Sequence, residues 1–225
     1  MISVIIPAYN SAAYILESIR SVRTQRLGSD AEIIVVDDGS SDDTKAIVEG
    51  LAKEDACIRL LCQDHRFAAS ARNLGISESH GEWIYLLDSD DVSLEGALDS
   101  LMDAAMRTGA KAVFGLTSDF ISPELTDAQK AGLKPRPQPY PGILPGASLI
   151  KKEVFDAVGA FDTSLSAAET VDWMVRFRES GFSSVDVPET VLGRRLHLNN
   201  TGRLRKAAEA ASYAMIIRRR LASKK

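Results

Sequence analysis

Apolar residues follow two spacings along the first half of the chain, which predicts alternating strands and helices. Short continuous apolar runs predict strands at 3–7, 32–36, 58–62, 83–87 and 112–116. Apolar residues at helical spacing predict helices that begin near Ser11 and Thr44 and that cover 68–79 and 94–107. This alternation is typical of an α/β fold. We therefore expect one Rossmann-like domain, a mostly parallel sheet with helices on both faces.

The pattern changes after residue 117. Residues 118–145 form a polar stretch that holds six of the eight prolines: Pro123, Pro135, Pro137, Pro139, Pro141 and Pro145. Because proline interrupts central strands and long helices, we expect an irregular segment, either a functional lid or a disordered insert. Beyond it the pattern predicts strands at 147–150, 184–187 and 190–196, and helices at 152–158 and 167–180 and in the tail.

Charge is distributed unevenly along the chain. The formal net charge is −4, but residues 203–225 carry eight Lys or Arg against one Glu, which leaves −11 on the remainder. An acidic body argues against nucleic-acid binding. The basic tail helix either packs on its own domain or lies against anionic lipid. We find no secretory signal and no apolar run near the ~20 residues that span a bilayer. We therefore expect a cytoplasmic location, with the tail as a peripheral contact at the inner face of the membrane.

Three carboxylates directly follow the apolar run at 83–87. Asp88, Asp90 and Asp91 arrive at the carboxyl end of a predicted strand, where open α/β sheets bind ligands. Asp88 and Asp90 flank one residue and can both face Mg²⁺ or Mn²⁺, which prefer oxygen ligands and often bring a phosphate. The alternative is a solvated acidic turn that caps a helix beginning near Ser93.

Two further motifs lie at predicted strand ends or on the helix between them. No Gly-rich dinucleotide fingerprint follows the first strand, which argues against a nicotinamide-dependent enzyme. Asp37 and Asp38 end the second strand, where a carboxylate can bind a ribose or a base edge, although such a turn also serves as a helix cap. Arg72 lies on a helix leading to the Asp88 strand and could reach a diphosphate, or it is a surface arginine.

Taken together, these residues resemble the inverting glycosyltransferases of family 2, which have the nucleotide-sugar-binding fold called GT-A. The likeness extends from Met1 to about Asn200. The matching stretches are Val4-Ile5-Ile6-Pro7-Ala8-Tyr9-Asn10, Ile34-Val35-Val36-Asp37-Asp38-Gly39-Ser40-Ser41-Asp42-Asp43-Thr44, Arg72-Asn73-Leu74-Gly75, Leu87-Asp88-Ser89-Asp90-Asp91, Gly159-Ala160-Phe161-Asp162 and Arg195-Leu196-His197.

The resemblance implies a division of the chain and a role for each motif. Residues 1–116 would be the nucleotide-sugar-binding half, 117–202 the acceptor-binding half with the Pro-rich loop 118–145, and 203–225 a basic C-terminal helix. The donor, most simply a UDP-sugar, would be held by Pro7, Ala8, Tyr9, Asp38, Arg72, Asp88 and Ser89. Mg²⁺ or Mn²⁺ would be held by Asp90, Asp88 and His197. The acceptor would be a glycan, a lipid or a protein.

The catalytic base is the point at which this chain departs from the family pattern. Relatives usually supply the base from a Glu-Asp pair, whereas this chain reads Glu169-Thr170 followed by Val171 and Asp172. Threonine is no base at neutral pH, so we expect Glu169 to act as base, with Asp172 as its rival or as an acceptor-binding group. Trp173 would form a floor under a sugar or belong to the core.

Two other functions fit parts of the same sequence. Asp88-Ser89-Asp90-Asp91-Val92 after an apolar strand also matches the first motif of haloacid-dehalogenase-type phosphatases, with Asp88 as nucleophile. A second alternative is a nucleotide-binding relative whose catalysis is impaired at Thr170. The transferase hypothesis requires that two neighbouring strands bring Asp38 and the Asp88–Asp90 pair to one pocket.

Overall fold

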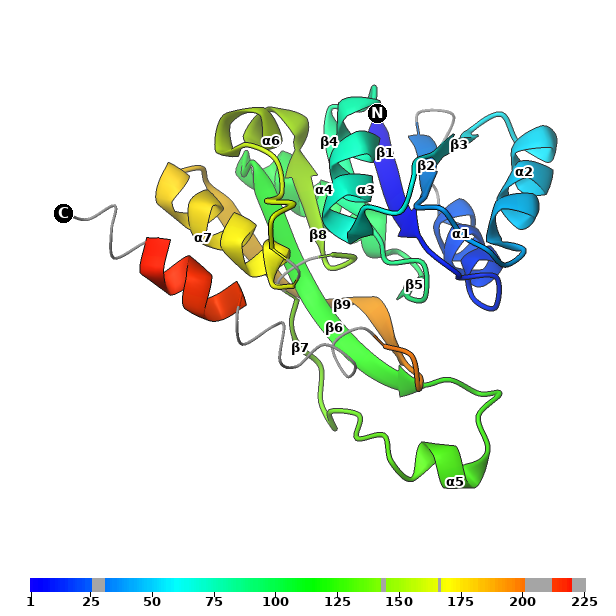
Figure 1. Ribbon diagram of the computed structural model, residues 1–225. Helices are drawn as coiled ribbons and strands as arrows, with labels where there is room; N and C mark the ends of the chain where they lie inside the picture. The colour runs from blue at the N-terminus through cyan, green and yellow to red at the C-terminus, as the bar shows by residue number, and fades with distance from the viewer. Residues whose placement is uncertain (26–30, 143–144, 166, 201–211, 220–225) are drawn as a thin grey trace.

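The computed structural model describes residues 1–25, 31–142, 145–165, 167–200 and 212–219 (Figure 1). Its strands are β1 (Ile2–Ala8), β2 (Ala31–Asp37), β3 (Ile58–Cys62), β4 (Trp83–Leu86), β5 (Val92–Ser93), β6 (Ala112–Ile121), β7 (Tyr140–Pro141), β8 (Ser148–Lys151) and β9 (Ser184–Leu196). Its labelled helices are α1 (Ile15–Arg23), α2 (Thr44–Glu54), α3 (Phe67–Ser77), α4 (Ala97–Thr108), α5 (Asp127–Lys130), α6 (Lys152–Val158) and α7 (Glu169–Ser180).

The strands of the described residues form one mixed sheet in the order β3-β2-β1-β4-β8-β6-β9-β5, with β7 paired to β6. Strands β3, β2, β1 and β4 are parallel, as are β6 and β9, whereas β8 runs antiparallel to both of its neighbours. The predicted α/β class is confirmed. One detail of the prediction was wrong, because β2 and β4 are not neighbours: β1 lies between them.

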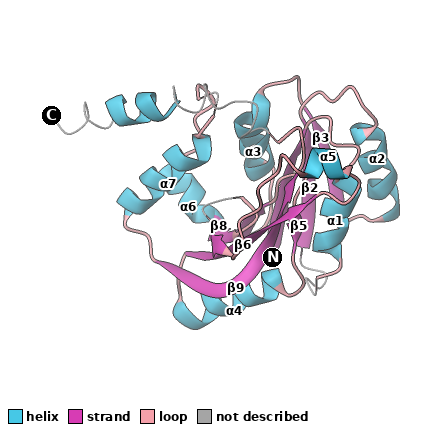
Figure 2. Ribbon diagram, turned by 90° about the horizontal axis from the view of Figure 1, so that it is seen from below, coloured by secondary structure: helices cyan, strands magenta, loops and turns pink. Residues whose placement is uncertain are grey.

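Helices cover both faces of this sheet (Figures 1 and 2). On one face, α1, α2 and α4 pack into one core cluster through residues such as Ile19, Val48 and Leu101, with α4 lying against β9, β6 and β8. On the other face, α3, α6 and α7 pack through residues such as Ile76, Phe155 and Phe177. Every residue of β1 and β2 is buried, as expected for strands covered on both sides.

Several predicted boundaries were wrong for identifiable reasons. The predicted strands 184–187 and 190–196 are one strand, β9, which pairs with β6 across irregularities in register. The helix expected near Ser93 begins at Ala97, because Val92 and Ser93 pair with β9 and Gly96 then turns the chain with a φ of 73°. The first helix begins at Ile15 instead of near Ser11, after a turn in which Tyr14 and Ile15 donate to the Ser11 carbonyl.

The Pro-rich segment is less irregular than predicted. Strand β6 continues through Ile121, so the first four residues of 118–145 lie in the sheet, ahead of the first proline at Pro123. The short helix α5 then begins with reciprocal hydrogen bonds between Thr126 and Gln129. Figure 1 shows this part of the chain projecting from the lower end of the sheet as an arm. Its role as a lid stays a prediction.

The predicted tail helix is confirmed for residues 212–219, and the rest of 203–225 lies outside the described residues. Figure 1 shows this helix beside α7. Ser212 and Ile216 are buried, and Arg219 pairs with Asp162. In the described ranges we find no helix whose length and apolar character would let it cross a bilayer.

Candidate functional site

The site forms where β2, β1 and β4 end at one edge of the sheet. The Asp38 amide donates to the Ala8 carbonyl (2.8 Å), which fixes the end of β2 against the end of β1. On the other side, the Ser11 and Ser89 hydroxyls lie 2.7 Å apart, which joins the loop after β1 to the acidic turn after β4. The sequence predicted these motifs to meet, and the loop after β1 contacts both of the others.

Asp38 is buried and its carboxylate has several partners. Gln63 Nε2 (2.6 Å) and the Arg66 amide (2.8 Å) donate to Oδ1, and His65 Nδ1 lies 2.9 Å from Oδ2. The His65 ring in turn contacts the Tyr9 ring at 4.1 Å and the Phe67 ring at 4.6 Å between centroids. The carboxylate is therefore held rigidly beneath exposed aromatic rings that could stack on a nucleobase.

Pro7 and Ala8 are the last two residues of β1 and are both buried. The Ala8 carbonyl already accepts the Asp38 amide. The backbone of these two residues therefore forms the buried end of β1 at the site. Tyr9, which follows them, is exposed and available for contact.

Arg72 is a buried cation that joins the two halves of the chain. Its Nη2 donates to Asp88 Oδ1 (2.9 Å) and its Nη1 to Glu169 Oε1 (2.7 Å), while its own exposure is 4%. Burial lowers the pKa of Arg72, but the two carboxylates outweigh it and raise the pKa above its usual value. Nε has no partner among the described residues. The alternative of a surface arginine is wrong.

Asp90 faces the end of β9. His197 Nε2 lies 2.8 Å from Asp90 Oδ2, and Asn200 Nδ2 donates to the same oxygen at 3.4 Å. Burial raises the pKa of Asp88, and the charge of Asp90 adds to the effect; the same two causes raise the pKa of Asp91 well above its usual range. The turn is thus partly buried and crowded with negative charge, which a divalent cation would relieve.

Carboxylate oxygens suit Mn²⁺ or Mg²⁺, so Asp88 and Asp90 fit the predicted metal, whereas the imidazole nitrogen of His197 is a ligand more typical of transition metals. In the described ranges no three His, Cys, Asp or Glu side chains converge as a complete metal site. Protein side chains would therefore supply only part of the coordination. Water and diphosphate oxygens commonly complete such sites.

Helix α7 carries the candidate bases. Glu169 is its first residue and follows Ala168, whose φ of 62° is unusual for a residue with a side chain. Asp172 instead accepts from Arg176 Nε (2.9 Å), and the same guanidinium donates to the Val158 carbonyl at the end of α6. The structure thus brings Glu169 to the donor residues and ties Asp172 to a contact between α7 and α6.

Trp173 belongs to the core. It is fully buried, stacks on Phe155 and Phe177, and donates from its indole nitrogen to the Gly159 carbonyl. The interpretation of this ring as a floor under a sugar was wrong, because its neighbours on α6 and α7 cover it.

Sequence reasoning missed the partners of Asp38, namely Gln63, His65 and the Arg66 amide, as well as Phe67, whose ring contacts His65. Their only signal is position, since they follow β3 and β3 pairs with β2. Phe67 has a φ of 65°, a conformation that aromatic residues rarely adopt and that no sequence pattern reveals. Sequence reasoning also missed that Arg195 contacts the acidic turn.

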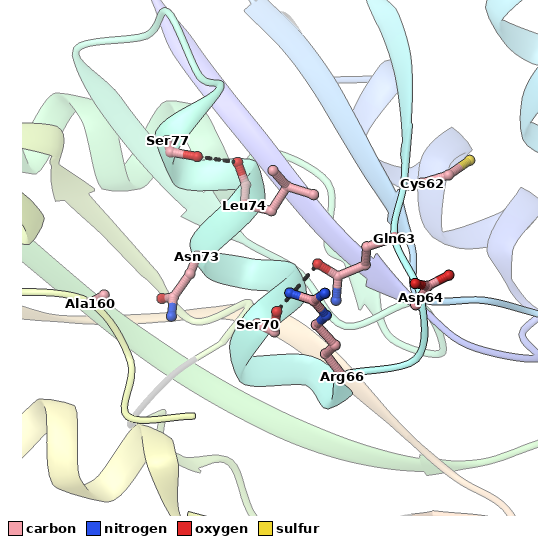
Figure 3. Close-up of a pocket in the computed structure, with 9 residues that line it drawn as sticks. All are labelled: Cys62, Gln63, Asp64, Arg66, Ser70, Asn73, Leu74, Ser77 and Ala160. Carbon is pink, nitrogen blue, oxygen red and sulfur yellow. Dashed lines mark hydrogen bonds between the residues drawn. The ribbon is translucent and has the colours of Figure 1, made fainter. Parts of the chain in front are cut away.

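An open depression of about 870 Å³ lies beside the site (Figure 3). Its lining includes Gln63 and Arg66, which bind Asp38, and Ser70 and Asn73 on the outer side of α3. Asp88 and Asp90 are not part of its lining. The depression therefore adjoins the base end of the predicted donor site and does not contain the acidic turn.

Comparison with known proteins identifies the family. Residues 3–159 match the model of glycosyl transferase family 2. The chain belongs to this family. It is similar to the glycosyltransferase GlyG of Streptococcus pneumoniae serotype 4, with 32% identity over 180 residues that cover 70% of this chain and 59% of that protein.

A second similar protein is the GalNAc(5)-diNAcBac-PP-undecaprenol beta-1,3-glucosyltransferase of Campylobacter jejuni. It is 40% identical over 116 residues, which cover 51% of this chain and 37% of that protein. The chain thus spans about three fifths or less of the length of these two relatives.

Solved structures share the fold. S. aureus TarS 1–349 in complex with UDP-GlcNAc has a TM-score of 0.73 at 19% identity, covering 88% of this chain and 59% of that chain. The same protein in complex with UDP gives a TM-score of 0.71 at 19% identity, with 87% and 60% covered. The expected GT-A fold is confirmed.

Proposed function

We propose that this chain is the catalytic region of a metal-dependent, inverting glycosyltransferase. It moves a sugar from a nucleoside-diphosphate sugar, most simply a UDP-sugar, to an acceptor. Membership in the family and TarS structures with UDP and UDP-GlcNAc support this donor class. The C. jejuni relative is named for a polyprenyl-diphosphate-linked glycan, which makes a lipid-linked glycan the first acceptor to test, ahead of a protein.

The observation that carries the proposal is the bridge that Arg72 makes between Asp88 and Glu169. Asp88 belongs to the strand end where the donor would bind, and Glu169 begins the helix of the acceptor half. One buried guanidinium thus fixes the positions of a donor-binding carboxylate and a candidate base relative to each other. Such positioning accounts for a large part of enzymatic rate enhancement.

In this proposal each motif acts on one part of the donor. Tyr9 stacks on the nucleobase, and Asp38, held by Gln63 and Arg66, accepts a hydrogen bond from base or ribose. Pro7, Ala8 and Ser89 line the same strand ends. Asp88, Asp90 and His197 would hold Mn²⁺ or Mg²⁺. When bound, the cation stabilises the negative charge that grows on the departing diphosphate.

Glu169 is the proposed base. Its Oε1 accepts from Arg72, and in the described part of the chain nothing donates to Oε2, which leaves one oxygen for the acceptor hydroxyl. The carboxylate removes the acceptor's proton as the hydroxyl attacks the anomeric carbon opposite the leaving diphosphate. Attack from that face inverts the anomeric configuration. Asp172 is less suited, because Arg176 occupies it.

The phosphatase alternative is not favoured. The family match covers the acidic turn, and the candidate nucleophile Asp88 is held by Arg72. A cytoplasmic location, and contact with the membrane through residues 203–225, remain part of the proposal.

The proposal is tested first by finding the donor. A ligand that binds only the folded state raises the melting temperature, so a panel of nucleotide sugars with and without Mn²⁺ should contain one that stabilises the protein in a Mn²⁺-dependent way. Turnover of that donor, with inverted product by NMR, completes the test. No stabilisation by any common nucleotide sugar would contradict the proposal.

The base is tested by Glu169→Gln, which keeps an oxygen for Arg72 but cannot take a proton. We expect turnover to fall about 10²- to 10⁴-fold while the donor-induced melting shift persists. Asp172→Asn is the matched control and should mainly lower the melting temperature. Loss of turnover only in the control would make Asp172 the base. Activity that appears only in Thr170→Asp would instead identify an impaired relative.

A further inference from the structure

Arg195 near the end of β9 is among the largest fully buried side chains, with 2% exposure. Burying a cation costs free energy unless nearby groups compensate it. Its carboxylate partner is Glu17 (Nη2 to Oε2, 2.6 Å), whose side chain is 58% exposed. The Tyr14 and Phe120 rings also contact the guanidinium, with centroids 4.9 and 4.7 Å away. These partners compensate the buried charge, and their positions show which parts of the fold Arg195 joins.

Two of the remaining hydrogen bonds of Arg195 go to the acidic turn. Its Nε donates to the Asp90 carbonyl (2.8 Å), and its backbone amide donates to Asp91 Oδ1 (2.9 Å). Its Nη1 donates to Ser122 Oγ at the end of β6 (3.2 Å). One side chain therefore fixes the main chain of Asp90 to β6 and, through Glu17, to α1.

The residues after Arg195 face the side chain of the same Asp90. Asn200 Nδ2 donates to the Arg195 carbonyl (3.0 Å), and Asn200 Oδ1 accepts the His197 amide (2.7 Å). That turn holds His197 Nε2 at 2.8 Å from Asp90 Oδ2. Residues 195–200 thus contact both the backbone carbonyl and the carboxylate of Asp90.

We propose that Arg195 is a positioning residue that sets the Asp90 carboxylate and the His197 imidazole toward one cation. The inference rests on the proposed function, since that function supplies the metal. Arg195 itself touches neither the cation nor the donor. Partners behind metal ligands orient them, and their loss typically weakens metal affinity about 10- to 100-fold.

The test is Arg195→Lys, with Arg194→Lys as the matched control. Lysine keeps the charge but has one nitrogen, so it cannot span Asp90, Ser122 and Glu17. Arg194 is the adjacent residue, with its side chain 41% exposed, and it contacts Asp119 at 3.7 Å and Tyr140 by a hydrogen bond. Calorimetry measures Mn²⁺ binding to the UDP-loaded protein and UDP binding in the absence of Mn²⁺, and a thermal melt of each variant measures its stability.

We expect Arg195→Lys to weaken Mn²⁺ binding to the UDP-loaded protein about 10- to 100-fold, with UDP binding in the absence of Mn²⁺ unchanged. Arg194→Lys should match the wild type. Glu17→Gln should lower the melting temperature and weaken Mn²⁺ binding by a smaller factor, because it removes one of the acceptors that hold the guanidinium against Asp90. A purely structural Arg195 would give the opposite result, a lower melting temperature with wild-type Mn²⁺ affinity, and would overturn the inference.

If Arg195→Lys does not fold, Ser122→Ala provides the second test. It removes one acceptor of the guanidinium and leaves Arg195 in place, so Mn²⁺ affinity should fall in the same direction by a smaller factor. Unchanged affinity would overturn the inference. A wild-type protein that binds UDP without any Mn²⁺ dependence would remove the proposed metal itself, a result distinct from failure at Arg195 alone.

Discussion

Arg72 shows what a single residue contributes and how much of its role the sequence reveals. Its position on the helix before the Asp88 strand predicted a contact with the donor side of the site. The bond to Glu169, 97 residues away, could not be predicted, because it depends on how α7 packs over the sheet. Asp38 is similar: its place at a strand end was predictable, but its partners Gln63 and His65 were not.

Glu32 is a residue with a strong electrostatic role away from the site. It lies on β2, where Ser3 Oγ, the His80 amide and Arg59 Nη1 donate to its carboxylate at 2.6 to 2.7 Å. Burial alone would raise the pKa of Glu32, but these hydrogen bonds outweigh it and lower the pKa from 4.5 to about 2. That difference corresponds to at most about 3 kcal/mol.

We expect this contribution to be present above pH 4.5 and to fade as the pH drops toward 2, because the carboxylate then becomes protonated in the folded state as well. Glu32→Gln should therefore lower the free energy of unfolding by about 2–3 kcal/mol at pH 7, and the difference should shrink at acid pH. Urea unfolding at several pH values measures it. Glu49→Gln, an exposed control, should change little. A Glu32→Gln deficit that is independent of pH would contradict this account.

At the scale of elements, the position of α3 depends on a close approach to the sheet. A Cβ added at Gly75 would lie 2.4 Å from Ile5 Cγ2 on β1. The helix that carries Arg72 can therefore pack at its observed distance only because residue 75 has no side chain. Gly50 in α2 offers a comparison, since nothing lies within 4 Å of an added Cβ there.

We expect Gly75→Ala to lower the free energy of unfolding by about 1–3 kcal/mol through overpacking. Gly50→Ala should raise it by about 0.5–1 kcal/mol, because alanine favours a helix more than glycine does. Urea unfolding of both variants separates the effect of overpacking on stability from the effect of helix propensity. Equal stabilisation by the two substitutions would show that α3 does not depend on this contact.

The elements also show why some boundaries were predictable. β1, β2 and β3 were predicted to within one residue at each end, because the mainly apolar run in each coincides with the paired segment. β9 was predicted as two strands because polar residues around Pro188 interrupt its pattern, although pairing with β6 carries the strand through that irregular stretch. Pairing between distant strands leaves little trace in local sequence.

At the scale of the whole molecule, the fold brings the ends of β2, β1 and β4 and the start of α7 to one edge of the sheet. The family motifs predicted which residues would meet there. They did not predict the contacts of Arg195. Its partners on α1, at the end of β6 and in the acidic turn belong to no pattern that stands out in the sequence. Since the chain spans only part of its relatives' length, the acceptor is a matter for experiment.

The central claim is that Asp38 and Asp90 serve opposite ends of one donor. Calorimetric titration of UDP into wild type, Asp38→Asn and Asp90→Asn, with and without Mn²⁺, tests it most directly. We predict that Mn²⁺ strengthens binding to the wild type, that Asp38→Asn weakens binding in both conditions, and that Asp90→Asn removes only the Mn²⁺-dependent part. The claim would be contradicted if Mn²⁺ did not change UDP binding to the wild type. It would also be contradicted if either variant bound UDP as the wild type does in both conditions.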